Sequence, residues 1–209
     1  MKMNNRWNRI IYRLWAPVYD AAVGGFFMAG RKRAMALAGL RPGERVLLVG
    51  VGTGADLLLM PAGVSAVCVD LSPEMLAQAQ KKLSASSSKV ILMQGDAQKL
   101  LVEPDSFDVA IFNLILSVIP DGAACLRENF RALKPGGRAV VFDKFLPNEG
   151  RLTMGRRVVN WGSTLLGTDI TRRFGDLCHE VNLEVISNEP SLMGGMYRVI
   201  LLRKPGDRV

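Results

Sequence analysis

The sequence predicts an α/β fold in which a doubly wound, mainly parallel sheet of seven strands ends in an antiparallel hairpin. From residue 45 onward, short apolar segments alternate with helical segments, which is typical of parallel strands joined by right-handed crossovers. The last two β-like segments have only about nine residues between them, too few for a crossover helix, so they should pair antiparallel. Roughly 40 residues that are expected to form two helices precede the sheet.

The strands are predicted from short apolar runs bounded by glycine, proline or polar residues. Five parallel strands are expected at residues 45–49, 65–70, 89–94, 107–113 and 138–143. The two strands of the hairpin are expected at residues 183–187 and 197–203.

Capping signals predict the helices between the strands. A helix should begin at Ser72-Pro73-Glu74 and run to about residue 83, because serine is a good N-cap and proline suits the first helical position. A second helix, at about residues 123–133, should end at the proline and glycines of residues 134–137. A helix should also follow the glycines at 50–54, and two helical segments are expected near 151–166 and 170–181.

Length and composition favour one folded unit without metal or disulfide chemistry. The 209 residues are 49% hydrophobic, enough for a full core, and we expect N-terminal helices over 1–41 and a single globular domain over 42–209 with a helical insert at about 150–181. Cys68, Cys125 and Cys178 are far apart and His179 is the single histidine, which argues against a disulfide framework or a metal site. No apolar run reaches the roughly 18 residues of a membrane span, so a cytoplasmic protein is expected.

The net charge of +8 is unevenly distributed along the chain. Residues 1–41 hold eight basic residues and one acidic residue, whereas residues 42–150 hold ten basic and twelve acidic. Residues 151–173 again carry five basic residues against Asp169. The excess therefore suggests an anionic partner that is met at the flanking segments and not in the central fold.

A glycine-rich turn and a following acid predict a ligand with an anionic group and a ribose. Gly50, Gly52 and Gly54 follow the first strand, where glycines allow a sharp turn and a ligand can lie against bare main chain. Asp70 ends the second strand, where a carboxylate can accept both hydroxyls of a ribose. The spacing of Gly50, Gly52 and Ala55 also satisfies the dinucleotide pattern, so a nucleotide-dependent oxidoreductase is one alternative.

Five segments together resemble the class I S-adenosylmethionine-dependent methyltransferases. These are Val46-Leu-Leu-Val-Gly-Val-Gly-Thr-Gly54, Val69-Asp-Leu-Ser-Pro-Glu-Met-Leu76, Gln94-Gly-Asp-Ala97, Phe107-Asp108 and Leu133-Lys-Pro-Gly-Gly137. They span about residues 45–143 in the family's order and spacing. The resemblance implies a Rossmann-like methyltransferase fold with S-adenosylmethionine as cofactor, and Gly54 and the antiparallel ending disfavour the oxidoreductase.

The resemblance also implies a set of cofactor-binding residues. The turn from Gly50 through Gly52 and Thr53 to Gly54 would hold the methionine moiety. Asp70 would bind the ribose hydroxyls, with Leu71 beside the adenine. Asp96 would accept from the adenine amine near the Ala97 backbone, and Asn113 would border the methionine and the reaction space.

One position departs from the family's pattern. Leu48 stands in the first strand where the family usually has an acid that helps to position the cofactor's amino group. Asn113 or an N-terminal residue could substitute for that acid. The departure also keeps open a protein that binds the cofactor without transferring a methyl group.

The N-terminal segment is predicted to form an amphipathic basic helix. Its apolar residues recur at three- and four-residue spacing, whereas Arg6, Arg9 and Arg13 fall on another face. Those apolar residues are Trp7, Ile10, Ile11, Leu14, Trp15 and Val18. Such a helix either lies in a membrane interface or packs on its own protein, and the sequence leaves both open. By resemblance, Tyr19 would cover the cofactor, with Tyr12 as a second choice.

The arrangement as a whole is similar to the soluble-type bacterial phosphatidylethanolamine N-methyltransferases, and in part to the quinone methyltransferases. The resemblance implies a lipid or small-molecule substrate, here at an anionic membrane surface reached through the basic N-terminal helix, with the protein peripheral on the inner face. Arg156-Arg157 and Arg172-Arg173 could meet lipid phosphates. Nucleic acid is disfavoured because Asn113-Leu-Ile-Leu116 replaces the Asn/Asp-Pro-Pro-aromatic motif of amino-group base methyltransferases. No catalytic residue is assigned.

Overall fold

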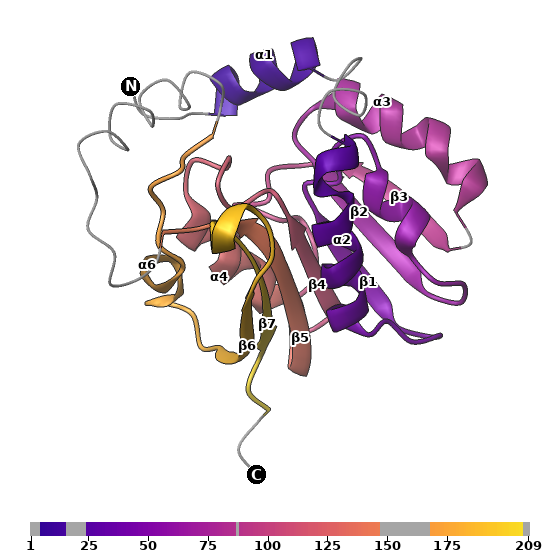
Figure 1. Cartoon of the computed structure of the whole chain (residues 1–209). Helices are drawn as coiled ribbons and strands as arrows, with labels where there is room; N and C mark the ends of the chain where they lie inside the picture. The colour runs from indigo at the N-terminus through magenta and orange to yellow at the C-terminus, as the bar shows by residue number, and fades with distance from the viewer. Residues whose placement is uncertain (1–4, 16–23, 87, 147–167, 207–209) are drawn as a thin grey trace.

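A computed structural model describes residues 5–15, 24–86, 88–146 and 168–206 (Figure 1). Its centre is a seven-stranded sheet in the order β3-β2-β1-β4-β5-β7-β6. The strands are β1 (Arg45–Val49), β2 (Ser65–Asp70), β3 (Lys89–Gln94), β4 (Phe107–Asn113), β5 (Leu133–Lys144), β6 (Glu184–Pro190) and β7 (Tyr197–Arg203). Strands β1 to β5 pair in parallel, and β7 lies antiparallel between β5 and β6. The predicted doubly wound sheet with an antiparallel end is confirmed.

Helices cover both faces of this sheet. They are α1 (Asn5–Trp15), α2 (Gly25–Ala38), α3 (Pro73–Lys82), α4 (Gly122–Ala132) and α6 (Phe174–Cys178). Alternate residues of β1 enter two separate apolar clusters, one that includes residues of α2 and α3 and one that includes residues of α4 and α6. Ser72 caps α3 as predicted, since it accepts from the Met75 N–H. Asp121 caps α4 in the same way by accepting from the Ala124 N–H, a cap that was not predicted.

Helix α2 packs closely on β5 because its contact residues are small. A Cβ on Gly30 would lie 2.1 Å from the Phe142 ring, so only glycine fits there. Ala34 and Ala38 continue the same helix face and are fully buried. This close approach sets Arg31, the next residue of α2, beneath the carboxyl ends of the strands.

The structure corrects several expected element boundaries. The glycine turn leads into a short 3-10 helix, η2 (Ala55–Leu59), and not an α-helix; it stops at Met60, which precedes Pro61 and is extended. Strand β5 begins at Leu133, so residues 134–137 belong to it. The first hairpin strand lies later than expected, at Glu184–Pro190, and α6 covers only part of the helix expected at 170–181.

The helix expected near 151–166 falls outside the described residues, as do Lys2, Val18, Tyr19 and Arg156-Arg157. Within the residues that the structure describes, no helix is both long and apolar enough to cross a membrane.

Candidate functional site

A cleft lies at the carboxyl ends of the parallel strands, where the strand order reverses between β1 and β4. Open α/β sheets bind ligands at this position, because the loops after neighbouring strands diverge there and leave a crevice. The cleft encloses about 850 Å3, counting its open mouth. Eight of the ten predicted cofactor-binding residues line it, namely Gly50, Gly52, Thr53, Asp70, Leu71, Asp96, Ala97 and Asn113.

Asp70 connects the glycine turn to the end of β2 through hydrogen bonds. One of its carboxylate oxygens accepts from the Gly52 N–H at 2.7 Å, and the other accepts from the Ser72 N–H at 3.0 Å. Gly50 and Gly52 have φ of +68° and +54°, a left-handed conformation that favours glycine. A Cβ on Gly52 would meet nothing within 4 Å, so the turn presents bare backbone to the open cleft.

Gly54 occupies a different place from the one predicted. It is not among the residues that line the cleft, and a Cβ at this position would lie 2.9 Å from the Ala79 Cα of α3. Its φ of +82° also requires the left-handed conformation. Gly54 therefore allows the turn to pack against α3, whereas Gly50 and Gly52 face the cleft.

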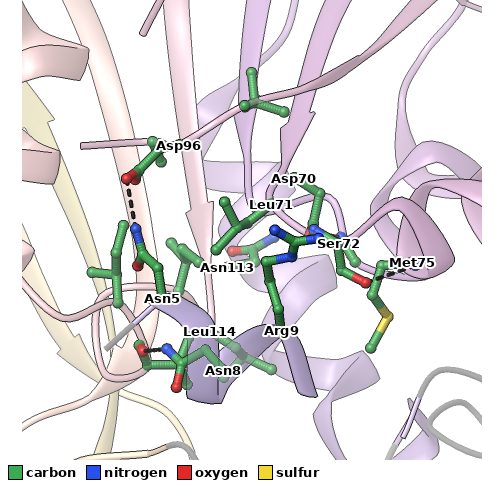
Figure 2. Close-up of a pocket in the computed structure, with 18 of the residues that line it drawn as sticks. Asn5, Asn8, Arg9, Asp70, Leu71, Ser72, Met75, Asp96, Asn113 and Leu114 are labelled. Carbon is green, nitrogen blue, oxygen red and sulfur yellow. Dashed lines mark hydrogen bonds between the residues drawn. The ribbon is translucent and has the colours of Figure 1, made fainter. Parts of the chain in front are cut away.

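Asp96 lies at the other end of the cleft and forms a hydrogen bond with a side chain of α1. Its Oδ2 accepts from the Asn5 amide at 2.7 Å, while its Oδ1 accepts from the Gln98 backbone and side chain at 2.9 and 2.8 Å. Figure 2 shows Asn5 reaching from α1 to Asp96 across the cleft. This contact was not predicted from the sequence, because it joins residues 91 positions apart.

Helix α1 lies across one end of the sheet (Figure 1), and its residues Asn5, Asn8 and Arg9 line the cleft (Figure 2). The Asn8 amide donates to the Val118 carbonyl at 2.5 Å, and Ile11 is buried. Arg6, Arg9 and Arg13 are exposed, as the amphipathic pattern predicted. The side chains of Tyr12, Leu14 and Trp15 lie outside what the structure describes, and the membrane role of the helix stays a prediction.

A buried network of three polar side chains lies under the glycine turn. Asp56 is fully buried; one oxygen pairs with the Arg31 guanidinium and the other accepts from the Asn113 amide at 2.9 Å. Arg31 and Asn113 both line the cleft. Neither Arg31 nor Asp56 was predicted from the sequence, although an acid two residues after the last glycine of the turn was a visible signal for Asp56.

Arg172, one of the basic residues after β5, differs from its expected role. The Arg172 guanidinium donates to the carbonyls of Leu116, Ile119 and Pro120 in the loop after β4. These hydrogen bonds hold the loop in place. Because the Arg172 side chain is also mostly buried, it is unsuited to bind a lipid phosphate. His179 lies exposed at the end of α6 and does not line the cleft, as expected for a surface histidine.

Comparisons with known proteins agree with this fold and cleft. Residues 47–141 match the family described as methyltransferase domain. Over 195 residues, the chain is 29% identical to a phosphatidylethanolamine N-methyltransferase of Cereibacter sphaeroides, covering 92% of this chain and 95% of that protein. It is 36% identical over 121 residues to a demethylmenaquinone methyltransferase of Staphylococcus aureus, covering 56% of this chain and 50% of that protein. A solved S-adenosylmethionine-dependent methyltransferase of Thermotoga maritima shares the fold, with a TM-score of 0.68 at 21% identity over 93% of this chain and 99% of that one.

These matches and the seven-stranded sheet with its antiparallel end support an S-adenosylmethionine-dependent methyltransferase. S-adenosylmethionine is its cofactor, and the alternative of a nucleotide-dependent oxidoreductase is set aside. Within the class, the chain resembles a phosphatidylethanolamine N-methyltransferase along nearly its whole length.

Proposed function

We propose that this methyltransferase transfers a methyl group to the amine of a phospholipid headgroup such as phosphatidylethanolamine, at a membrane surface. The observation that carries the proposal is the similarity to a phosphatidylethanolamine N-methyltransferase, which extends beyond the matched methyltransferase domain to 92% of this chain. The exposed arginines of α1, a helix that lines the cleft, also support it. A headgroup phosphate would meet these arginines before its amine enters the cleft.

The cleft residues fit S-adenosylmethionine by their chemistry. The two Asp70 oxygens each have a lone pair left for the ribose hydroxyls after accepting one backbone N–H. Gly52 offers bare backbone beside open space for the methionine arm. Asp96 would bind the adenine amine through the lone pair that its Oδ2 keeps after accepting from the Asn5 amide.

The rest of the cleft suits an amphiphilic acceptor. The loop after β4 supplies an apolar wall that includes Leu114, Ile115 and Val118. When bound, S-adenosylmethionine supplies an electrophilic methyl group on its sulfonium. The protein's part is to exclude water and align an amine that arrives neutral, and such alignment contributes about 7–11 kcal/mol in well-oriented reactions.

The test is methyl transfer from cofactor labelled in its methyl group. Three kinds of vesicle are compared. The first contains phosphatidylethanolamine. The second contains phosphatidylcholine, whose nitrogen cannot accept a further methyl group, and the third contains phosphatidylcholine with demethylmenaquinone. We expect label in N-methylated products of phosphatidylethanolamine in the first vesicles, and no label in the lipids of the other two. Label in the quinone alone would replace the proposal with the quinone methyltransferase that the 36% identical relative supports as second candidate.

Membrane binding should depend on the exposed charges of α1. Each basic residue near an anionic bilayer contributes about 1 kcal/mol to binding. The double variant Arg6→Gln with Arg13→Gln should therefore bind anionic vesicles with about 30-fold lower affinity, as measured by sedimentation. Arg9 is kept because it lines the cleft. Binding should also weaken as salt rises, because screening shortens the reach of each charge.

The matched control removes two charges from the far end of α3, by Lys81→Gln with Lys82→Gln. If both double variants bind vesicles as the wild type does, α1 is only a cover of the cleft, and a soluble acceptor becomes the better hypothesis.

Cofactor affinity should fall on acidification through the titration of Asp70. Burial raises the pKa of this carboxyl, and the N–H groups of Ser72 and Gly52 oppose the rise only in part. Asp70 therefore takes up a proton at a higher pH than an ordinary aspartate, whose pKa is about 3.9, and a protonated carboxyl accepts hydrogen bonds less strongly. Calorimetry with S-adenosylhomocysteine should show that the affinity of the wild type falls as the pH is lowered. In Asp70→Asn the affinity should no longer depend on pH in this range. An identical pH dependence in both proteins would contradict the assignment.

A further inference from the structure

The network of Arg31, Asp56 and Asn113 joins three distant elements at the floor of the cleft. Arg31 comes from α2, Asp56 from η2 and Asn113 from the end of β4, and all three are at least nine-tenths buried. Asp56 bonds to both of its neighbours through different oxygens. It is itself absent from the cleft lining, whereas its two partners line the cleft.

Asp56 determines which way the Asn113 amide is turned. A carboxylate only accepts hydrogen bonds, so the NH2 group of Asn113 must face it. The amide oxygen is then directed away from Asp56, and it is buried without a hydrogen-bond partner among the described residues. A buried acceptor without a partner is unfavourable, and a ligand that donates a hydrogen bond there would satisfy it.

The acid that the family usually carries in the first strand is missing from this chain. Leu48 is buried in the apolar cluster that contains residues of α2, and it offers no charge to the cleft. Asp56 supplies a negative charge from the 3-10 helix, but the Arg31 guanidinium neutralises it. The cleft is therefore offered an amide oxygen and a guanidinium, which complement the ammonium and the carboxylate of a zwitterionic amino acid.

We propose that Asp56 is a positioning residue for the amino-acid arm of the cofactor and takes over the task of the acid that Leu48 replaces. One carboxylate oxygen of Asp56 accepts from the Asn113 NH2 group, which turns the Asn113 amide oxygen toward the ammonium of the cofactor. The second carboxylate oxygen pairs with the Arg31 guanidinium and holds it in place for the carboxylate of the cofactor. The proposal rests on the placement of S-adenosylmethionine in this cleft under the proposed function.

The test compares two ligands that differ in the amino-acid arm. S-adenosylhomocysteine has the arm, whereas 5′-methylthioadenosine keeps the adenosine and the sulfur but lacks the ammonium and the carboxylate. By calorimetry, Asp56→Asn should weaken binding of S-adenosylhomocysteine about tenfold or more and that of 5′-methylthioadenosine by less than about twofold. The matched control is Glu44→Gln, which breaks the Glu44–Arg138 ion pair. Glu44 directly precedes β1, at the amino ends of the strands and away from the cleft, so both affinities should stay unchanged.

Asn113→Leu provides a second variant in case Asp56→Asn does not fold. It removes the amide oxygen, keeps the Arg31–Asp56 pair and should give the same selective loss. An equal loss for both ligands, or no loss, would overturn the proposal and leave Asp56 as a structural tie between α2 and the sheet. Wild-type protein that binds neither ligand would instead overturn the cofactor placement on which the proposal rests.

Discussion

Replacing Asp70 with alanine is expected to lower the affinity for S-adenosylmethionine by about tenfold or more, because a hydrogen bond to a charged group contributes about 1.5–3 kcal/mol. The variant loses the proposed ribose acceptor and also frees the Gly52 N–H that the carboxylate now holds. The fold should survive, since Asp70 ends its strand at the cleft. Burial raises its pKa, so ionised Asp70 opposes folding at neutral pH and its loss removes that cost.

The control for this variant is Asp108→Ala. Asp108 also accepts a backbone N–H, from Arg45, and pairs with Lys134, but it lies near the start of β4, away from the cleft. Calorimetry should show unchanged cofactor affinity for Asp108→Ala and the full loss for Asp70→Ala. Equal affinities in the two variants would mean that the cofactor is bound elsewhere.

Gly54→Ala is expected to destabilise the protein by roughly 3 kcal/mol, from left-handed backbone strain together with overpacking. The new Cβ would lie 2.9 Å from backbone of α3, which cannot move as a flexible side chain can. For a chain of this size, that loss should lower the Tm by about 6–12 °C. Gly52→Ala is the matched variant, because it carries the same kind of strain but its Cβ meets open space.

The two glycine variants should separate stability from binding. Gly52→Ala should lose only about 1–2 kcal/mol of stability but should bind S-adenosylhomocysteine more weakly, because its methyl group projects where the ligand is expected. Thermal denaturation and calorimetry measure the two effects. A Gly52→Ala protein with wild-type affinity, or a Gly54→Ala protein with wild-type Tm, would contradict the roles assigned to these glycines.

Most of the sheet could be predicted from the sequence because buried parallel strands are short, continuous apolar runs. The predicted bounds of β1 to β4 and of β7 agree with the structure. The hairpin strand β6 was placed too early because it is an edge strand with mostly exposed and partly exposed residues, so its pattern is weak. The conformation after the glycine turn was wrong because the position of Pro61 limits the helix to five residues.

The cleft was predictable where a single segment carries the signal. Glycines after a strand and an acid at the end of the next strand indicate a site without knowledge of the tertiary fold. The contacts that sequence reasoning missed are Arg31 with Asp56 and Asn5 with Asp96, and both pairs join separate elements. Arg31 faces the cleft because Gly30 lets α2 approach β5, a packing event that no local pattern reveals.

The most direct test of the methyltransferase account is the thermal stability of the wild-type protein with different ligands. A ligand that binds only the native state adds RT ln(1 + [L]/Kd) to the free energy of unfolding, about 2.7 kcal/mol at 100 times Kd. We predict that S-adenosylhomocysteine raises the Tm in a concentration-dependent way and that NADH and NADPH do not. A larger rise with either nicotinamide nucleotide than with S-adenosylhomocysteine would contradict the account and favour the oxidoreductase.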